Sequence, residues 1–417
     1  MGNANNSNSD PGRSAKSSSG TPRVLLVGYN GANNTGSEAR LLTIIEEFRY
    51  VLGSEVEITV PTLNEGNLRR YLKEGPKLYI APVPSLYFFA MKRLVKENDL
   101  VVLVEGSCYM DTWAYYLLWA FLGATKYAHA MGKPSLAYAV DSGEVSDANR
   151  LRIAREASKT DLIITRTCAA AERLRTWGVT APIEVTGDQA FVFEPHLEDE
   201  GLMRRVWPEA GSSVAGIAVV DFYIWPVVVR PWDRSRYLYK WPYYFSHSNE
   251  RSLASEALAG SLAAQADRLT EQHGKHVALI CMENVDEPLA REVRRRMKRP
   301  DLARVFSSRE FNSSQMTSVL RNLDLLLTSR YHASVLSMAA HVPQIAVGHD
   351  LRLEDLYGEI GIKEEYFFKH NTPNLWEKVR ARVDALVEDP EPVKKLLKRG
   401  NEEQVKRALR NRELLLK

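Results

Sequence analysis

The segment from Leu323 to Ala340, LDLLLTSRYHASVLSMAA, carries the side chains best suited to chemistry. Arg330 and His332 stand two residues apart at the end of an apolar run. If a strand extends through Arg330, both side chains project to one side, just where the next helix begins. A guanidinium, an imidazole and helix-terminal amides can hold a phosphate or carboxylate, and His332 can deliver a proton. We therefore predict that Arg330 and His332 are catalytic, although a lone histidine is often structural.

Acidic residues follow three further predicted strands. Glu105 ends LVVLVEGS beside Ser107, Asp141 follows PSLAYAV, and Asp188 lies in VTGDQAF. A carboxylate there is costly unless it is exposed or paired, so Glu105 is a candidate base or sugar-hydroxyl ligand. Three such residues indicate a polyhydroxylated ligand more than a polyanion. A buried, salt-bridged Glu105 is the alternative, and any of the three carboxylates could be a helix N-cap.

A glycine-rich segment, GYNGANNTGSEARLL, directly follows the first predicted strand. Its glycines allow tight backbone approach, and Thr35 with Glu38 has the spacing of a capping box, which predicts a helix beginning there with free amides facing a cleft. Such amides can hold an anion or a polar substrate. Ser37 and Glu38 replace the Lys and Ser/Thr of a P-loop, which argues against a Walker-type ATPase. A turn that only connects strand and helix is the alternative.

The alternation of short β-rich runs with helical patterns predicts the elements that position these residues. The pattern starts at Val24, is interrupted near Glu194–Ser213 by a polar stretch, and resumes at Val214. We predict an α/β fold of two doubly wound Rossmann-like domains, GT-B-like, with a ligand cleft between them at the carboxyl ends of the strands. The predicted parts are a disordered tail (1–22), an N-terminal domain (23–195), a linker (196–213), a C-terminal domain (214–375) and C-terminal helices (376–417).

Composition excludes several classes of protein. The 417 residues are 45% hydrophobic and 26% charged, and 55 Lys plus Arg against 52 Asp plus Glu leave a net charge of only +3, which argues against nucleic-acid binding. Three separated cysteines form no CxxC pair, and no apolar leader is present, which together indicate a cytoplasmic protein. The longest apolar run, Trp113–Ala124, is shorter than the roughly 20 residues of a membrane span. No metal-ligand cluster is evident.

Two segments suggest further contacts. Residues 221–245 interleave tryptophans and tyrosines with arginines, which is typical of a surface that stacks on sugars or meets a membrane. We interpret it as an acceptor-binding flap, and an insertion packed onto the second domain is the alternative. The basic C-terminal stretch from Lys394 suits either a solvated helix or peripheral contact with anionic lipid at the inner membrane surface.

These segments, in this order, resemble the polysaccharide pyruvyl transferase family. GYNGANNTGSEARLL is similar to the family's Gly-Asn-x-Gly-Asp-Glu-Ala segment, VEGSCYMD stands at its glycine-rich turn, and TRTCAAAERLRTWGV and TGDQAFVF are similar to its Val-Arg-Asp and Asp-Pro-Ala-Phe segments. TSRYHAS matches its Arg-Leu-His signature, and GHDLRLEDL resembles the segment that follows. Ser37, Glu105, Tyr331 and Thr167 depart from the family pattern. The resemblance covers roughly Val24 to Ile362 and implies a GT-B-like enzyme that moves a pyruvyl group from phosphoenolpyruvate to a sugar.

Arg330, His332 and the lack of a metal-ligand cluster lead us to expect a mechanism without a metal or cofactor, in which phosphoenolpyruvate, the donor that the resemblance implies, is the co-substrate. His332 would protonate the enol methylene, Arg330 would bind phosphate or carboxylate, and Glu105 or Asp188 would accept a proton from a sugar hydroxyl. The expected partners are a small-molecule donor and a glycan or lipid-linked saccharide acceptor. The alternatives are a GT-B glycosyltransferase that uses a nucleotide sugar and a non-catalytic glycan-binding descendant of the family. The residues assigned to substrate binding are Gly28, Asn34, Ser37, Glu38, Ser107, Asp141, Arg166, Ser329, His349 and Arg352.

Overall fold

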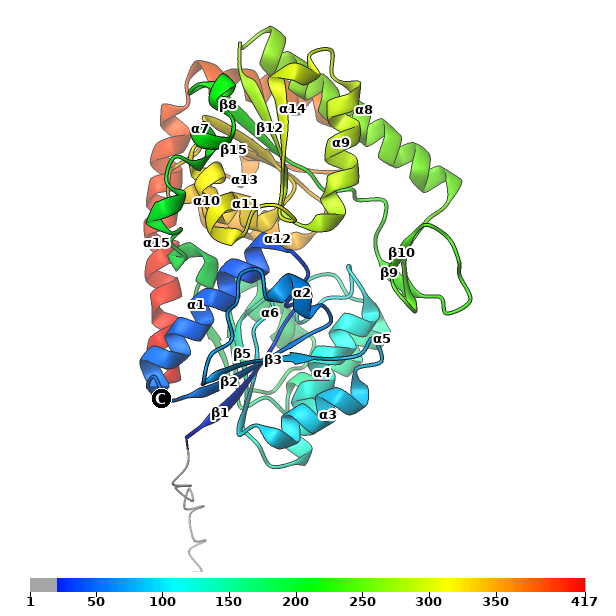
Figure 1. Ribbon diagram of the computed structural model, residues 1–417, viewed down its shortest axis with the longest axis vertical. Helices are drawn as coiled ribbons and strands as arrows, with labels where there is room; N and C mark the ends of the chain where they lie inside the picture. The colour runs from blue at the N-terminus through cyan, green and yellow to red at the C-terminus, as the bar shows by residue number, and fades with distance from the viewer. Residues whose placement is uncertain (1–20, 417) are drawn as a thin grey trace, which may run out of the picture.

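The computed structural model describes residues 21–416, so nearly all of the predicted tail, 1–22, lies outside the described residues. The first of its two large sheets has seven strands in the order β3-β2-β1-β4-β5-β6-β7, all parallel (Figure 1). Both faces are buried, because Val24 and Leu26 of β1 pack on one side and Leu25 and Val27 on the other. The strands are β1 (Arg23–Val27), β2 (Glu57–Thr62), β3 (Leu78–Pro82), β4 (Leu100–Leu103), β5 (Ser135–Val140), β6 (Leu162–Thr165) and β7 (Ile183–Val185).

Helices cover both faces of this sheet. Ile44 and Phe48 of α1 pack on one face, and Leu94 of α3, Phe121 of α4 and Ile153 of α5 pack on the other. The buried faces of these helices repeat at helical spacing, as expected for elements that shield a parallel sheet from water. The helices are α1 (Thr35–Leu52), α2 (Glu65–Leu68), α3 (Phe88–Glu97), α4 (Tyr115–Ala130), α5 (Asp147–Ala157) and α6 (Cys168–Thr176).

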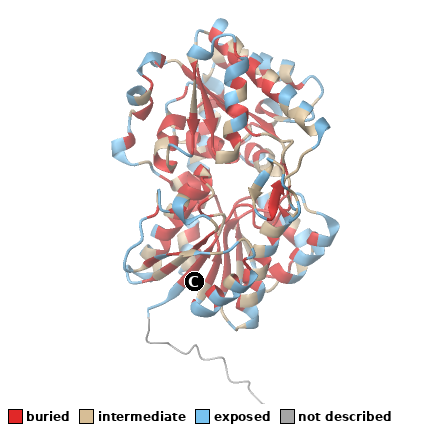
Figure 2. Ribbon diagram, turned by 45° about the vertical axis from the view of Figure 1, so that its right-hand side comes forward, coloured by how far each residue is buried: buried red, intermediate tan, exposed pale blue. Residues whose placement is uncertain are grey.

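The second large sheet has six parallel strands in the order β13-β12-β8-β14-β15-β16. In each sheet the strand order reverses beside the first strand, which is the doubly wound arrangement of a Rossmann-like domain. The predicted α/β fold of two such domains is confirmed, and buried residues concentrate in both sheets (Figure 2). The strands are β8 (Val214–Ala218), β12 (His276–Cys281), β13 (Ala303–Ser307), β14 (Leu325–Thr328), β15 (Gln344–Gly348) and β16 (Phe367–Lys369).

The segment expected as a linker, 196–213, contains the short helix α7 (Leu202–Val206). Leu202, Met203 and Trp207 are buried in the core of the second sheet. This segment therefore packs as part of the second domain, because its apolar side chains gain from burial there. The other helices of this domain are α8 (Asn249–Glu271), α9 (Glu287–Arg296), α10 (Ser313–Arg321), α11 (Tyr331–Met338), α12 (Leu351–Glu359), α13 (Lys363–Tyr366) and α14 (Leu375–Glu388).

The last helix, α15 (Glu391–Leu415), runs back along the first domain (Figure 1). The buried Asn411 accepts a hydrogen bond from Thr186 Oγ1 (2.7 Å), and Leu414 joins the core on the α1 side of the first sheet. Gly187 allows this close approach, because a Cβ there would lie 2.8 Å from the Gln404 carbonyl oxygen. The basic C-terminal stretch is therefore a helix with one buried face that ties the two domains together.

The aromatic segment forms a separate antiparallel sheet of β9 (Val227–Val229), β10 (Leu238–Lys240) and β11 (Tyr243–Phe245). It packs against the first domain, whereas the alternative interpretation from the sequence was an insertion packed onto the second domain. Tyr243 donates a hydrogen bond to the Ser85 carbonyl (2.7 Å) and stacks on Tyr116 with ring centroids 3.8 Å apart. We call residues 227–245 the aromatic hairpin.

Candidate functional site

The loops at the carboxyl ends of the strands of both domains enclose a chain of three cavities. A central cavity of about 60 Å³ is lined by Asn34 and Glu105 from the first domain and by Arg330 and Arg352 from the second. It shares Arg330 and Arg352 with a cavity of about 30 Å³, and Tyr29 with one of about 270 Å³. Ligands bind doubly wound domains at these strand ends. The residues assigned from sequence that line the three cavities are Gly28, Asn34, Glu105, Ser107, Ser329, Arg330, His332, His349 and Arg352.

The sequence interpretation placed Arg330 at the end of a strand, and this is wrong. Strand β14 ends at Thr328, and Arg330 is the N-cap of α11. Its guanidinium is buried and donates from Nε to Asp286 Oδ2 (2.9 Å) and from Nη1 to Glu283 Oε2 (3.2 Å). Arg330 and His332 nevertheless line the same 30 Å³ cavity, because the helix begins directly after Arg330. Helix geometry, rather than strand alternation, brings the two side chains to one site.

His332 sits where α11 crosses α1. A Cβ at Gly36 would lie 2.0 Å from the His332 ring, so only glycine leaves room for this imidazole. His332 Nε2 is 3.6 Å from Asp188 Oδ2 and has no hydrogen-bond partner among residues 21–416. Burial lowers the pKa of His332 below 6.5, although the neighbouring Asp188 carboxylate acts to raise it. At neutral pH this imidazole is therefore mainly neutral, until an anion arrives beside it.

His349 and Arg352 form the other wall of the 30 Å³ cavity. Neither ring nitrogen of His349 has a hydrogen-bond partner in the described part of the chain, and burial lowers the pKa of this histidine to about 4. Arg352 donates from Nε to Asp350 (3.0 Å), and its guanidinium lies over the Trp113 ring at 5.1 Å. The Asp350 carboxylate also lines this cavity but is paired with Arg352, so the cavity offers neutral imidazoles and guanidinium groups to a small anionic group.

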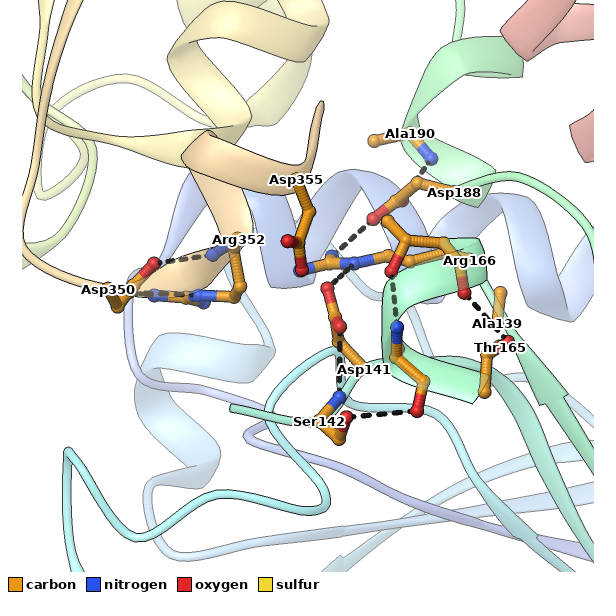
Figure 3. A network of polar contacts seen from close by, with 12 residues as sticks. Ala139, Asp141, Ser142, Thr165, Arg166, Asp188, Ala190, Asp350, Arg352 and Asp355 are labelled. Carbon is orange, nitrogen blue, oxygen red and sulfur yellow. Dashed lines mark hydrogen bonds and ion pairs between the residues drawn. The ribbon is translucent and has the colours of Figure 1, made fainter. Parts of the chain in front are cut away.

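A network of buried ion pairs lies next to this cavity, which it approaches where Asp188 nears His332 (Figure 3). Arg166 donates from Nε to Asp141 (2.8 Å) and from Nη1 to Asp188, and Arg40 donates to Asp188 (3.1 Å). Burial alone would raise the pKa of Asp188, but Arg40 and Arg166 hold it well below its usual range. The Arg166 guanidinium also lies 3.9 Å from the centroid of the Tyr331 ring. Asp141, Arg166 and Asp188 do not line the three cavities; they support the turn that carries His332.

Glu105 faces the central cavity from the loop after β4. Ser37 Oγ donates to Glu105 Oε2 (3.0 Å), so two of the positions that depart from the family pattern contact each other. The N-cap of α1 is Asn34 rather than Thr35, and its Oδ1 accepts from the Ser37 amide (3.1 Å). The Thr35 amide donates to the Met282 carbonyl (2.8 Å). The amides of Thr35 and Ser37 therefore donate hydrogen bonds within the protein, one of them to the second domain. The prediction of free amides facing a cleft is wrong for these two.

Glu38 is buried on α1 and does not line these cavities. Its two carboxylate oxygens lack a hydrogen-bond partner among the described residues, and burial raises its pKa to about 8, against the effect of Arg70. The unfolded chain loses this proton near pH 4.5, so between pH 4.5 and 8 the native state binds more protons. We expect the free energy of unfolding to fall by up to about 1.4 kcal/mol per pH unit in this window.

Glu38→Gln is expected to remove this slope, because its side chain is neutral at every pH. Urea unfolding of both proteins at pH 5, 6, 7 and 8 measures the difference. Parallel pH profiles of the two proteins would show that Glu38 is ionised in the native state.

Several residues of the site were not recognised from the sequence. Glu283 and Asp286 follow the strand HVALIC, so the signal that identified Glu105, an acidic residue after an apolar strand, was present for them too. Tyr29 and Tyr239 line the central cavity, and Arg40 reaches Asp188 from the second turn of α1. Only the tertiary contacts reveal Arg40, because an arginine within a helix usually points to solvent.

Two further observations bear on the chemistry. Within residues 21–416, no group of three His, Cys, Asp or Glu side chains is arranged to hold a metal ion. No helix in the described part of the chain combines the length and apolarity needed to cross a membrane.

A model of the polysaccharide pyruvyl transferase family matches residues 34–350, a range that contains Glu105, Arg330 and His332. The chain belongs to this family. The resemblance noted from the motifs is therefore confirmed, and this polysaccharide pyruvyl transferase family member carries Arg352 just beyond the matched range. No curated protein matches the chain in a sequence search.

Solved structures that resemble this family member share its fold at low sequence identity. HepE of Anabaena in complex with UDP-glucose is 12% identical, with a TM-score of 0.58 over 94% of this chain and 98% of HepE. MnaA of S. aureus with UDP is 11% identical, with a TM-score of 0.61 over 93% of this chain and 94% of MnaA. The UDP-GlcNAc 2-epimerase of Neisseria meningitidis bound to UDP-GlcNAc is 10% identical, with a TM-score of 0.60 over 95% and 99%. These likenesses support the GT-B-like arrangement of the two domains.

Proposed function

We propose that this protein transfers a pyruvyl group from phosphoenolpyruvate to two hydroxyl groups of a saccharide, forming a ketal and releasing phosphate. The observation that carries the proposal is the 30 Å³ cavity, which Arg330 and Arg352 line together with His332 and His349, whose rings have three nitrogens without a hydrogen-bond partner among residues 21–416. Buried polar atoms without partners point to a ligand that supplies them. Guanidinium groups and imidazole N–H groups suit the phosphate or carboxylate of the donor.

In the proposed reaction, His332 protonates the methylene carbon of the enol, which creates an oxocarbenium-like centre at the adjacent carbon. Two saccharide oxygens form bonds to that carbon, and the bond from it to the phosphate oxygen breaks. The hydroxyl groups release two protons, of which one replaces the proton that His332 gave and the other leaves with phosphate. Arg330 and Arg352 stabilise the negative charge that collects on the leaving group.

The negative charge of the donor also favours the protonated form of His332 that the reaction requires. An anion beside the buried imidazole favours its charged form and raises the pKa that burial has lowered. Glu105 is the better base for the attacking hydroxyl, because it faces the central cavity, whereas Asp188 is bound to two arginines below it. Asp188 then acts as a positioning residue for His332. We propose no metal or organic cofactor.

The acceptor in this proposal is a glycan or a lipid-linked saccharide presented at the cytoplasmic face of a membrane. The chain of cavities supports a saccharide, because Glu105, Ser107 and Asn34 offer groups that bind hydroxyls. Peripheral membrane contact stays a prediction from the basic C-terminal stretch, whose helix has one face packed on the first domain.

Binding of the donor is expected to raise the thermal stability of the protein. Phosphoenolpyruvate at 100 times its Kd adds about 2.7 kcal/mol to the free energy of unfolding. Arg352→Met removes a charge-assisted contact worth about 1.5–3 kcal/mol, which weakens donor affinity roughly 10- to 100-fold. A thermal melt with increasing phosphoenolpyruvate measures both effects, and Arg295→Met, an exposed substitution on α9, is the matched control. Equal stabilisation of wild type and Arg352→Met would contradict the donor site.

A GT-B glycosyltransferase that uses a nucleotide sugar is the second candidate, because HepE and MnaA were solved with UDP-containing ligands or UDP. The same thermal melt with UDP-glucose and UDP-GlcNAc separates the two. Stabilisation by a nucleotide sugar alone would favour this candidate. Glycan binding without phosphate release would favour a non-catalytic role.

A further inference from the structure

The 270 Å³ cavity beside the central cavity is not needed by the donor, and its walls are mainly apolar. Met91 of α3 and Ala120 of α4 form one side, and Leu238 and Phe245 of the aromatic hairpin form the opposite side. The hairpin therefore creates the cavity by closing over the first domain. A pocket with these walls favours an occupant with substantial apolar surface.

Three of the polar side chains on the cavity wall, those of Asn30, Asn67 and Lys240, already bind the protein itself. Asn30 Nδ2 donates to the Leu26 and Pro61 carbonyls (3.3 and 3.2 Å), and Asn67 Nδ2 donates to the Gly31 carbonyl (3.1 Å). The Lys240 ammonium donates to the Leu63 carbonyl. Because these donors are committed, a polar ligand would lose its hydrogen bonds to water without gaining equivalent ones from them. An apolar occupant needs no such partners.

The boundary between the two cavities is polar. Tyr29 donates to Glu283 Oε1 (3.1 Å) and its hydroxyl also hydrogen-bonds to that of Tyr239. These three side chains come from the first domain, the second domain and the hairpin, and all three line both cavities. Aromatic rings that carry hydroxyl groups suit a sugar ring at this boundary. Along the chain of cavities the walls thus change from arginine, histidine and carboxylate side chains, through tyrosine hydroxyl groups, to apolar side chains.

We propose that the 270 Å³ cavity binds an apolar group, an alkyl or isoprenoid chain, attached to the acceptor sugar. This inference rests on the proposed function, which places the sugar in the central cavity beside Glu105. The apolar chain then anchors the acceptor on the side of the sugar opposite the donor. Acceptors without such a chain bind weakly.

The test compares octyl β-D-glucoside with methyl β-D-glucoside by isothermal titration calorimetry, below the concentration at which the octyl compound forms micelles. The two share a sugar, so the ratio of their affinities reports the chain alone. The octyl compound is expected to bind about 100-fold tighter, the effect of burying three to four methylene groups, with a negative heat-capacity change. Equal affinities, or no measurable binding of either compound, would overturn the proposal.

Filling the cavity provides the structural control. Ala120→Phe is expected to abolish the preference for the octyl compound, whereas Ala130→Phe, exposed at the end of the same helix, is expected to keep it. Leu238→Trp fills the cavity from the half-exposed hairpin and serves if Ala120→Phe does not fold. An octyl preference that survives in the folded cavity-filling variants overturns the proposal. The calorimetry contains no donor, so it tests the apolar cavity independently of the donor site. If the octyl compound binds more tightly but phosphoenolpyruvate does not raise the thermal stability, only the donor assignment is refuted.

Discussion

Replacing His332 by glutamine is expected to lower the turnover of pyruvyl transfer by about 100- to 10,000-fold, the usual contribution of a general acid. Donor affinity is expected to change much less, because Arg330, Arg352 and His349 line the same cavity and remain. Glutamine retains a hydrogen-bonding group of similar reach but cannot protonate carbon. Steady-state release of phosphate, with kcat and KM determined separately, measures both effects.

The pH profile of the wild type supplies a second readout of the same residue. Burial lowers the pKa of His332, so kcat/KM, which reports the free enzyme, is expected to fall as the pH rises above that lowered value. In the proposed mechanism the bound donor raises this pKa, so the fall in kcat is expected at higher pH. His129→Gln, at an exposed position on α4, is the matched control and should leave both profiles unchanged. Near-normal turnover in His332→Gln would remove this residue from the mechanism.

Replacing Arg166 by methionine is expected to lower the free energy of unfolding by about 3–5 kcal/mol, the cost of breaking a buried ion pair by removing one partner. Arg166 is fully buried and binds both Asp141 and Asp188, so its loss leaves two buried carboxylates with fewer compensating charges. Gly106 shows how closely this side chain is packed, because a Cβ there would lie 2.6 Å from Arg166 Nη1.

Equilibrium unfolding in urea at pH 7 measures this loss. Arg155→Met is the matched control, because Arg155 pairs with Glu156 at 2.7 Å but is 69% exposed, and such surface pairs contribute at most about 1 kcal/mol. A loss below 1 kcal/mol in Arg166→Met would mean that the two carboxylates find other partners or bind protons in the native state.

Asp188 shows that a local motif does not by itself assign a role to a carboxylate. A carboxylate after a strand was assigned to catalysis, yet Asp188 is bound by Arg40 and Arg166 and only approaches His332 from below. The same sequence signal, an acidic residue after an apolar run, also fits Glu105, which does face the central cavity. Whether such a carboxylate meets a cation or a cavity depends on residues distant in the sequence, which local pattern does not contain.

The aromatic hairpin shows a related limit. Its composition indicated a surface that could stack on sugars, and the side chains of Tyr239 and Phe245 line cavities as that interpretation requires. It packs on the first domain, through the Val227 amide, which donates to the Trp113 carbonyl (2.8 Å), and through stacking on Tyr116, although the hairpin is inserted in the second domain. An insertion can fold back on any nearby apolar surface, and chain order does not specify which one.

The amino-acid sequence by itself determined the alternation of strands and helices, and therefore the two doubly wound domains, because hydrophobic periodicity acts over a few residues. It also determined the family, through short motifs that include Arg330 and His332. Only the tertiary structure decided that Gly36 makes room for His332, that Glu283 and Asp286 hold Arg330, and that the hairpin encloses an apolar cavity. These features depend on distances between atoms of segments far apart in the chain, which the packing of the two domains fixes and local sequence does not.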